Sequence, residues 1–68
     1  MNKFTELNPP ERSRTYHLFE GEKLTFNDVL RISISDSGTH RLETGDGLKH
    51  IVPDLWIAIT IDTDAWTF

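Results

Sequence analysis

Two runs of alternating apolar and polar residues constrain the fold of this chain more than any other feature. In residues 29–35, Leu30, Ile32 and Ile34 share one side, and residues 55–62 repeat the pattern more strongly. A period of two is that of a β-strand with one buried face. The sequence therefore predicts β-strands, and we expect the core to be lined by Leu55, Ile57, Ile59 and Ile61.

Two shorter segments with strand-forming residues precede these runs. Residues 15–20 end before Gly21, and residues 23–26 are followed by Asn27 and Asp28, which break strands. Asn27 could instead cap a short helix, although the alternating residues that follow it favour a strand.

The N-terminal residues 1–14 are expected to form an extended arm. The segment Asn8-Pro9-Pro10 disfavours a helix, because proline has no backbone N–H and restricts the residue before it. The arm is either flexible or packed on the domain through Phe4 and Leu7.

The first predicted hairpin has a three-residue loop at residues 36–38, with Gly38 in the left-handed region. This register places Ile32 opposite Leu42 and Arg31 opposite Glu43, so that apolar meets apolar and opposite charges meet. A slip of one residue would send side chains to the wrong face, which favours the three-residue loop.

The second predicted hairpin turns at Asp46-Gly47, a strong signal for a two-residue type I′ turn. That turn would place Leu42 opposite Ile51 and Glu43 opposite His50. We therefore predict a three-stranded meander whose outer face carries a cross-strand ladder of Arg31, Glu43 and His50.

These features predict an all-β fold: a small antiparallel meander of five or six short strands. The sheet would form an open SH3-like or OB-like barrel or a strongly twisted sheet, with residues 15–68 as a single domain. A chain of 68 residues buries a small core, and without cysteine no disulfide can reinforce it. The lack of cysteine, of a long apolar run and of an apolar N-terminal signal favours a cytoplasmic protein without a membrane span.

The charge of the chain limits its partners. The formal net charge is −4, and a broad phosphate-binding surface needs clustered lysine and arginine. In size and acidity the chain resembles many short reading frames of phages, prophages and plasmids. We expect a non-enzymatic accessory or inhibitor module that binds a basic protein, or a homodimer; the alternative is an oligonucleotide-binding small β-barrel.

The C-terminal segment, residues 61–68, combines the acidic Asp62 and Asp64 with the aromatic Trp66 and Phe68. In its general design it is similar to the acidic tip of bacterial single-strand-binding proteins, and the resemblance implies docking into a basic, apolar pocket. Alternatively, its aromatic residues complete the core of the barrel. The candidate binding residues of the whole chain are Tyr16, Trp56, Asp62, Asp64, Trp66 and Phe68.

Catalytic and metal-binding patterns have simpler explanations. Ser35, Asp36 and His40 supply the residue types of a hydrolase triad, but turns and strands account for them. His17, His40 and His50 match no known metal-ligand spacing. We therefore expect no enzymatic activity, no bound metal and no cofactor.

The sheet is expected to leave free edges that invite another strand. The segments nearest the chain ends, residues 15–20 and 65–68, are the expected edges. The expected partner is another protein or a second copy, nucleic acid is less expected, and no membrane is involved.

Overall fold

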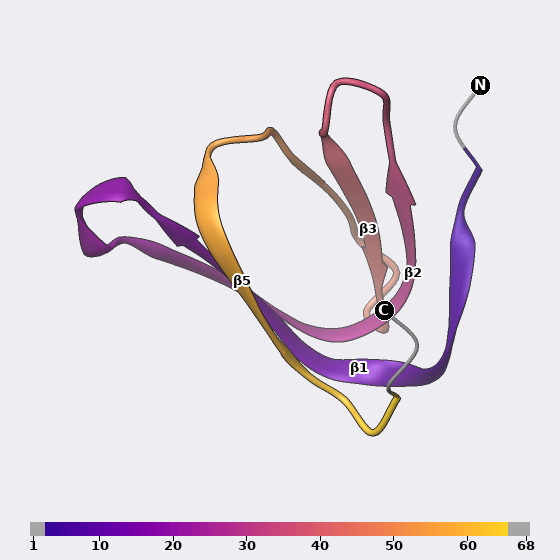
Figure 1. The fold of residues 1–68 in the computed structure, drawn as a ribbon. Helices are drawn as coiled ribbons and strands as arrows, with labels where there is room; N and C mark the ends of the chain where they lie inside the picture. The colour runs from indigo at the N-terminus through magenta and orange to yellow at the C-terminus, as the bar shows by residue number, and fades with distance from the viewer. Residues whose placement is uncertain (1–2, 66–68) are drawn as a thin grey trace.

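The computed structural model describes residues 3–65, which form one antiparallel sheet with a single short 3₁₀ turn, η1 (Phe19–Gly21). The strand order is β4-β3-β2-β1-β5, and the sheet is not closed (Figure 1). The predicted all-β, antiparallel fold is confirmed. The strands are β1 (Thr5–Leu18), β2 (Lys23–Ile34), β3 (His40–Thr44), β4 (Lys49–Val52) and β5 (Trp56–Asp62).

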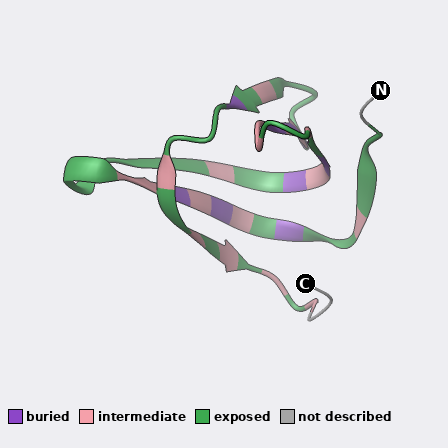
Figure 2. Ribbon diagram, turned by 45° about the horizontal axis from the view of Figure 1, so that its top comes forward, coloured by how far each residue is buried: buried purple, intermediate pink, exposed green. Residues whose placement is uncertain are grey.

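The sheet curls strongly, as the connection between its last two strands requires. β4 ends at Val52 and β5 begins at Trp56, yet the two strands lie at opposite edges of the sheet. A connection this short can join the two edges only if the sheet bends round so that they approach each other. The result is an open barrel whose concave side holds the core (Figures 1 and 2).

Strand β1 includes most of the segment expected to be an arm. It begins at Thr5, which lies opposite Ile32, and it continues through residue 14 without a break. Its pairing with β2 is interrupted between Glu6 and Glu11, the stretch that contains both N-terminal prolines. Prolines cannot donate to the ladder, so the strand bends there while it remains extended.

The first hairpin follows the predicted register. Ile32 lies opposite Leu42, and Arg31 lies opposite Glu43. The Gly38 N–H donates to the Ser35 carbonyl over 2.9 Å, and Gly38 has φ 89°. Glycine suits this position because a Cβ disfavours the left-handed region.

The predicted register of the second hairpin is wrong by one residue. Leu42 lies opposite His50, and Glu43 lies opposite Lys49. Consequently Ile51 is 68% exposed, while the next residue, Val52, is buried.

A three-residue loop causes this shift. The Thr44 N–H donates to the Leu48 carbonyl over 3.1 Å, which leaves Gly45, Asp46 and Gly47 as the loop. Of the loop's last two residues only Gly47 has a positive φ (83°), whereas a type I′ turn needs two. An Asp46 carboxylate oxygen accepts hydrogen bonds from the Thr44 hydroxyl at 2.6 Å and from the Leu48 N–H at 3.0 Å, which stabilises the wider loop.

The predicted core face of β5 is also wrong in its first half. Leu55 is 64% exposed and Ile57 is 60% exposed, while Ile59 and Ile61 are half-buried. Trp56, which the alternation assigned to the opposite face, packs against the core together with Ile59.

A β-bulge explains the reversal. His17 of β1 lies opposite Ala58, but the next residue, Leu18, lies opposite Trp56, so Ile57 has no partner on β1. An inserted residue of this kind shifts the alternation by one position. Sequence periodicity alone gives no sign of where such an insertion falls.

The core is small and comes from four of the five strands. A similar bulge in β2 leaves Leu30 without a partner on β3, so Val29 replaces it in the core. The fully or nearly fully buried apolar side chains are Tyr16, Val29, Ile32, Leu42 and Val52.

Candidate functional site

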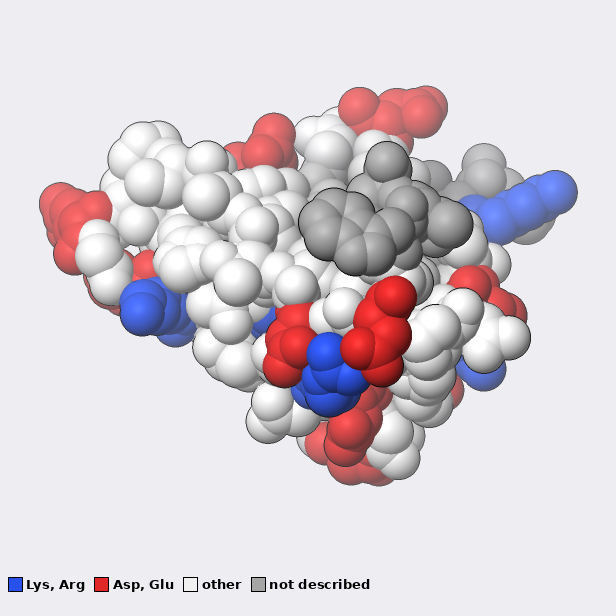
Figure 3. Space-filling view, turned by 60° about the horizontal axis from the view of Figure 1, so that its bottom comes forward, with Lys and Arg blue, Asp and Glu red and all other residues white. Residues whose placement is uncertain are grey.

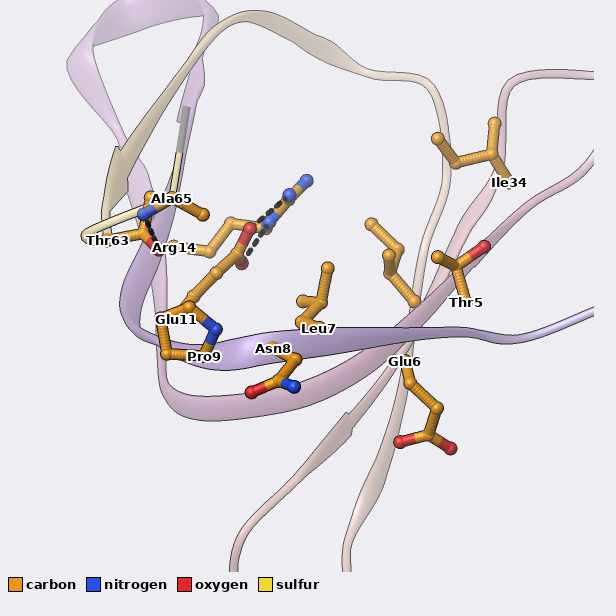
Figure 4. Close-up of a pocket in the computed structure, with 11 residues that line it drawn as sticks. Thr5, Glu6, Leu7, Asn8, Pro9, Glu11, Arg14, Ile34, Thr63 and Ala65 are labelled. Carbon is orange, nitrogen blue, oxygen red and sulfur yellow. Dashed lines mark hydrogen bonds and ion pairs between the residues drawn. The ribbon is translucent and has the colours of Figure 1, made fainter. Parts of the chain in front are cut away.

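A pocket of about 360 Å³ opens on the concave side of the sheet. Its volume falls within the range of about 300–1,000 Å³ that is typical of ligand pockets. The first half of β1, the end of β2 and the segment after β5 form its walls (Figure 4). The lining residues are Thr5, Glu6, Leu7, Asn8, Pro9, Glu11, Arg14, Ile32, Ile34, Thr63 and Ala65.

The walls of this pocket are largely apolar. Leu7 and Ile32 contribute from adjacent strands, and Ala65 contributes from the segment that follows β5. Ile34 at the end of β2 is 60% exposed, although its register places it on the same side as the buried Ile32. An exposed isoleucine beside a pocket is available for contact with an apolar group of a ligand or a partner.

A buried ion pair forms part of the pocket lining. Arg14 donates from Nε and Nη2 to the two carboxylate oxygens of Glu11, at 2.8 and 2.7 Å (Figure 4). The Glu11 residue is 1% exposed and the Arg14 residue is 5% exposed. This bidentate geometry is the strongest form of the arginine–carboxylate pair.

The sequence does not predict this pair, because side chains three residues apart lie on opposite faces of a regular strand. In both β1 and β2 the alternation of buried and exposed residues shifts by one position at this point. In β2 the shift lies between Phe26, which packs on the core, and the buried Val29. Asp28, between these two residues, has φ 54°. The local irregularity allows Glu11 and Arg14 to point into the same space.

The ion pair continues into a network of buried polar side chains inside the barrel. The hydroxyl of Tyr16, which neighbours Arg14 on the same face of β1, lies 2.8 Å from Nδ1 of His40 on β3. The His40 ring also packs against Trp56, with ring centroids 4.6 Å apart. We refer to Glu11, Arg14, Tyr16 and His40 as the buried network.

The charges of the buried network follow from its surroundings. Although burial opposes its charge, hydrogen bonds to Glu11 and Tyr16 raise the pKa of Arg14. Burial raises the pKa of Tyr16, so its hydroxyl stays protonated. Burial and the nearby charge of Arg14 lower the pKa of His40, which favours the neutral ring. Nδ1 of a neutral His40 ring can accept the proton of the Tyr16 hydroxyl.

Two of the predicted binding residues take part in the core. Tyr16 is fully buried, so it lies in the interior and is not available as a surface contact. Trp56 is half-buried, and its ring lies 5.0 Å from that of Tyr16. Both aromatic rings contribute to the packing around His40.

The predicted acidic residues of the C-terminal segment bind an arginine of β1. Asp62 accepts from Arg12 Nη2 at 2.7 Å, and Asp64 accepts from Arg12 Nη1 at 3.0 Å. The hydrogen bond from Arg12 lowers the pKa of Asp62. Trp66 and Phe68, the aromatic candidates of the same segment, lie outside the described residues.

The predicted ladder on the outer face is formed in part. Arg31 Nη1 lies 3.0 Å from a Glu43 carboxylate oxygen, as their register predicts. His50 is not a member of this ladder, because the one-residue shift turns it to the opposite face. There its Nε2 lies 3.1 Å from the Thr44 hydroxyl.

The described residues 3–65 contain no group of three or more histidine, cysteine or acidic side chains that could hold a metal ion. His40, considered for a hydrolase triad, has its Nδ1 beside Tyr16.

Within residues 3–65, no helix is long and apolar enough to cross a membrane. On the face shown in Figure 3, acidic and basic residues are interspersed, without a continuous basic surface.

Comparisons with known proteins leave the site to be interpreted from its own geometry. No protein-family model, no curated protein and no solved structure matches the chain.

Proposed function

We propose that the protein is a small non-enzymatic binding module whose pocket accepts an apolar side chain of a partner protein. The observation that carries the proposal is the pocket of about 360 Å³ with Leu7, Ile32 and Ile34 in its walls. Apolar anchors that enter a pocket supply much of the energy of protein interfaces. A backbone segment in extended conformation could present such an anchor to the concave side of the sheet.

Charge supports a basic partner. The chain carries a net charge of −4. The exposed Glu6 beside the pocket already binds Arg31 Nε over 2.9 Å, so the support comes from the net charge of the chain. Opposite charges around an apolar contact accelerate association and suppress wrong partners. An accessory or inhibitor protein of the type found in short phage reading frames would use such a pocket to occupy a surface of its target.

Binding of oligonucleotides has less support. Bases would need exposed aromatic rings in a basic groove. Tyr16 is buried and Trp56 packs on His40, so neither ring offers a free stacking platform.

A peptide library tests the proposal. We expect selection of random extended peptides to recover sequences with one apolar residue flanked by basic residues. Ile34→Ser should lower the affinity for these peptides at least about tenfold, as expected for loss of a central anchor. The matched control is Leu48→Ser, since Leu48 is similarly exposed (57%) but directly precedes β4 and does not line the pocket. Equal affinity of wild type and Ile34→Ser, or failure to select any peptide, would contradict the proposal.

A further inference from the structure

The expected edge at residues 15–20 is wrong, because most of this segment belongs to β1, which lies between β2 and β5. The edge strands of the described residues are β4 and β5, and they differ in how well they are protected. β4 has four residues, begins with Lys49 and is followed directly by Pro53. β5 has seven residues, contains no proline and carries no charge before Asp62. Short length, lysine and proline are the features that protect edges from adding another strand. Only β4 has them.

We propose that the outer edge of β5 pairs with the same edge of a second copy of this chain, in antiparallel orientation about a two-fold axis. This contact is independent of the pocket proposed above for a partner protein. A two-fold contact uses the same surface on both copies, so the strand must be complementary to itself.

The sequence of β5 meets that requirement when the axis passes beside Thr60. Ile59 of one copy then lies opposite Ile61 of the other, and Thr60 lies opposite Thr60. Ile59 and Ile61 both face the core side and are only half-buried, so each copy would cover the other's isoleucines. Apolar and threonine pairs directly across two strands are favourable.

Charge also permits this pairing. In the same register Asp62 of one copy faces Ala58 of the other, so the two Asp62 side chains do not oppose each other. Arg12 already binds Asp62 and Asp64 within each chain. The remaining repulsion between two chains of net charge −4 acts over distance and is screened by salt.

The small core gives a reason for association. The described residues bury five apolar side chains, whereas eight large apolar residues are exposed, including Leu55 and Ile57 beside the β5 edge. One strand pair covers less than the roughly 1,200–2,000 Å² of a stable interface. We therefore expect a weak dimer that is populated at high concentration.

Sedimentation equilibrium from low micromolar to millimolar concentration tests the contact. The expected result is an average mass that rises from one chain toward two, and more steeply at higher salt. A mass of one chain throughout would overturn the proposal. A mass beyond two chains would also overturn it, because it would indicate head-to-tail pairing of β4 with β5.

Charge variants at the axis sharpen the test. Thr60→Lys places two lysines opposite each other and should weaken the dimer at least about tenfold. An equimolar mixture of Thr60→Lys and Thr60→Glu should restore it, because opposite charges then meet. The matched control is Thr25→Lys, an exposed threonine in the same cross-strand row but on β2, away from the edge. Circular dichroism establishes that each variant is folded.

If the mixture associates no better than Thr60→Lys alone, the proposed register is overturned. If Thr25→Lys weakens the dimer as much as Thr60→Lys does, the location at the β5 edge is overturned. Ile34→Ser should leave dimerisation unchanged, so failure of the pocket proposal and failure of this one are distinguishable.

Discussion

Arg12 and Arg14 are two residues apart on β1 and both bind carboxylates, but their surroundings are opposite. The Arg12 side chain is 54% exposed and bridges Asp62 and Asp64 on the surface. The Arg14 side chain is 6% exposed and binds Glu11 inside the barrel. The bond lengths are similar, at 2.7–3.0 Å for Arg12 and 2.7–2.8 Å for Arg14.

The comparison teaches that the geometry of an ion pair says little about its energy. Water and salt screen the exposed bridges, and they replace much of the interaction when a partner is lost. The buried pair has given up its hydration, so each member depends on the other. Removing one partner should therefore have very different effects at the two arginines.

The largest expected effect is that of Arg14→Ala. It leaves the buried Glu11 carboxylate without its partner, and loss of one member of a buried pair costs about 3–5 kcal/mol. A domain of this size is stabilised by only about 3–5 kcal/mol, so the variant should be largely unfolded. Urea denaturation followed by circular dichroism measures the change.

The double variant Glu11→Leu/Arg14→Met serves as its control. Replacing both charges with apolar side chains of similar size should recover most of the lost stability. A single variant Arg14→Ala that unfolds at the wild-type urea concentration would show that the pair is not buried in solution.

An intermediate effect is expected from acid, through His40. Burial lowers the pKa of His40 below its value of 6.5 in the unfolded chain. Between these two pKa values the unfolded state binds more protons, so the free energy of unfolding falls as the pH falls below about 6.5. The slope should reach at most about 1.4 kcal/mol per pH unit for one group.

The measurement is the free energy of unfolding in urea at several pH values between 5 and 8. His40→Gln should remove the slope in this window, whereas His17→Gln, at a partly buried surface position, should keep it. The pKa of Asp62 is lowered from its usual value of 3.8, so Asp62 takes up a proton only below this pH window and does not contribute to the slope. An unchanged slope in His40→Gln would exclude the buried network as its source.

The smallest expected effect is that of Arg12→Ala. Its bridges to Asp62 and Asp64 lie in water, so the midpoint of thermal unfolding should change by no more than the error of the measurement. High salt should remove any remaining difference from wild type. A loss of stability comparable to that of Arg14→Ala would mean that exposure does not separate the two arginines.

The first hairpin could be predicted because several local signals agree on one register. Only the three-residue loop with Gly38 pairs Ile32 with Leu42 and Arg31 with Glu43. The second hairpin offered conflicting signals: Asp46-Gly47 and the pairing of Leu42 with Ile51 favour a shorter loop, whereas the observed register pairs Glu43 with Lys49. The hydrogen bonds of Asp46 with Thr44 and Leu48 form only in the folded loop.

The buried network could not be predicted from periodicity. Glu11 and Arg14 fell in the expected arm, and their spacing is wrong for one face of a strand. Tyr16 was identified as a candidate residue, but as a surface contact. Its partner His40 lies 24 positions away, and only the pairing of three strands brings the two side chains together.

The sequence by itself determined the β class, the antiparallel order of the central strands and the first hairpin, because alternation and turn residues act over a few neighbouring positions. Only the tertiary structure decided which side chains are buried at the ends of the strands. Bulges at Leu30 and Ile57 shift the alternation, and a change of phase between Glu11 and Arg14, beside the irregular Asp28 of β2, places both side chains inside. The physical reason is that a curled sheet must insert residues to bend, and the place of insertion depends on strands that are distant in sequence.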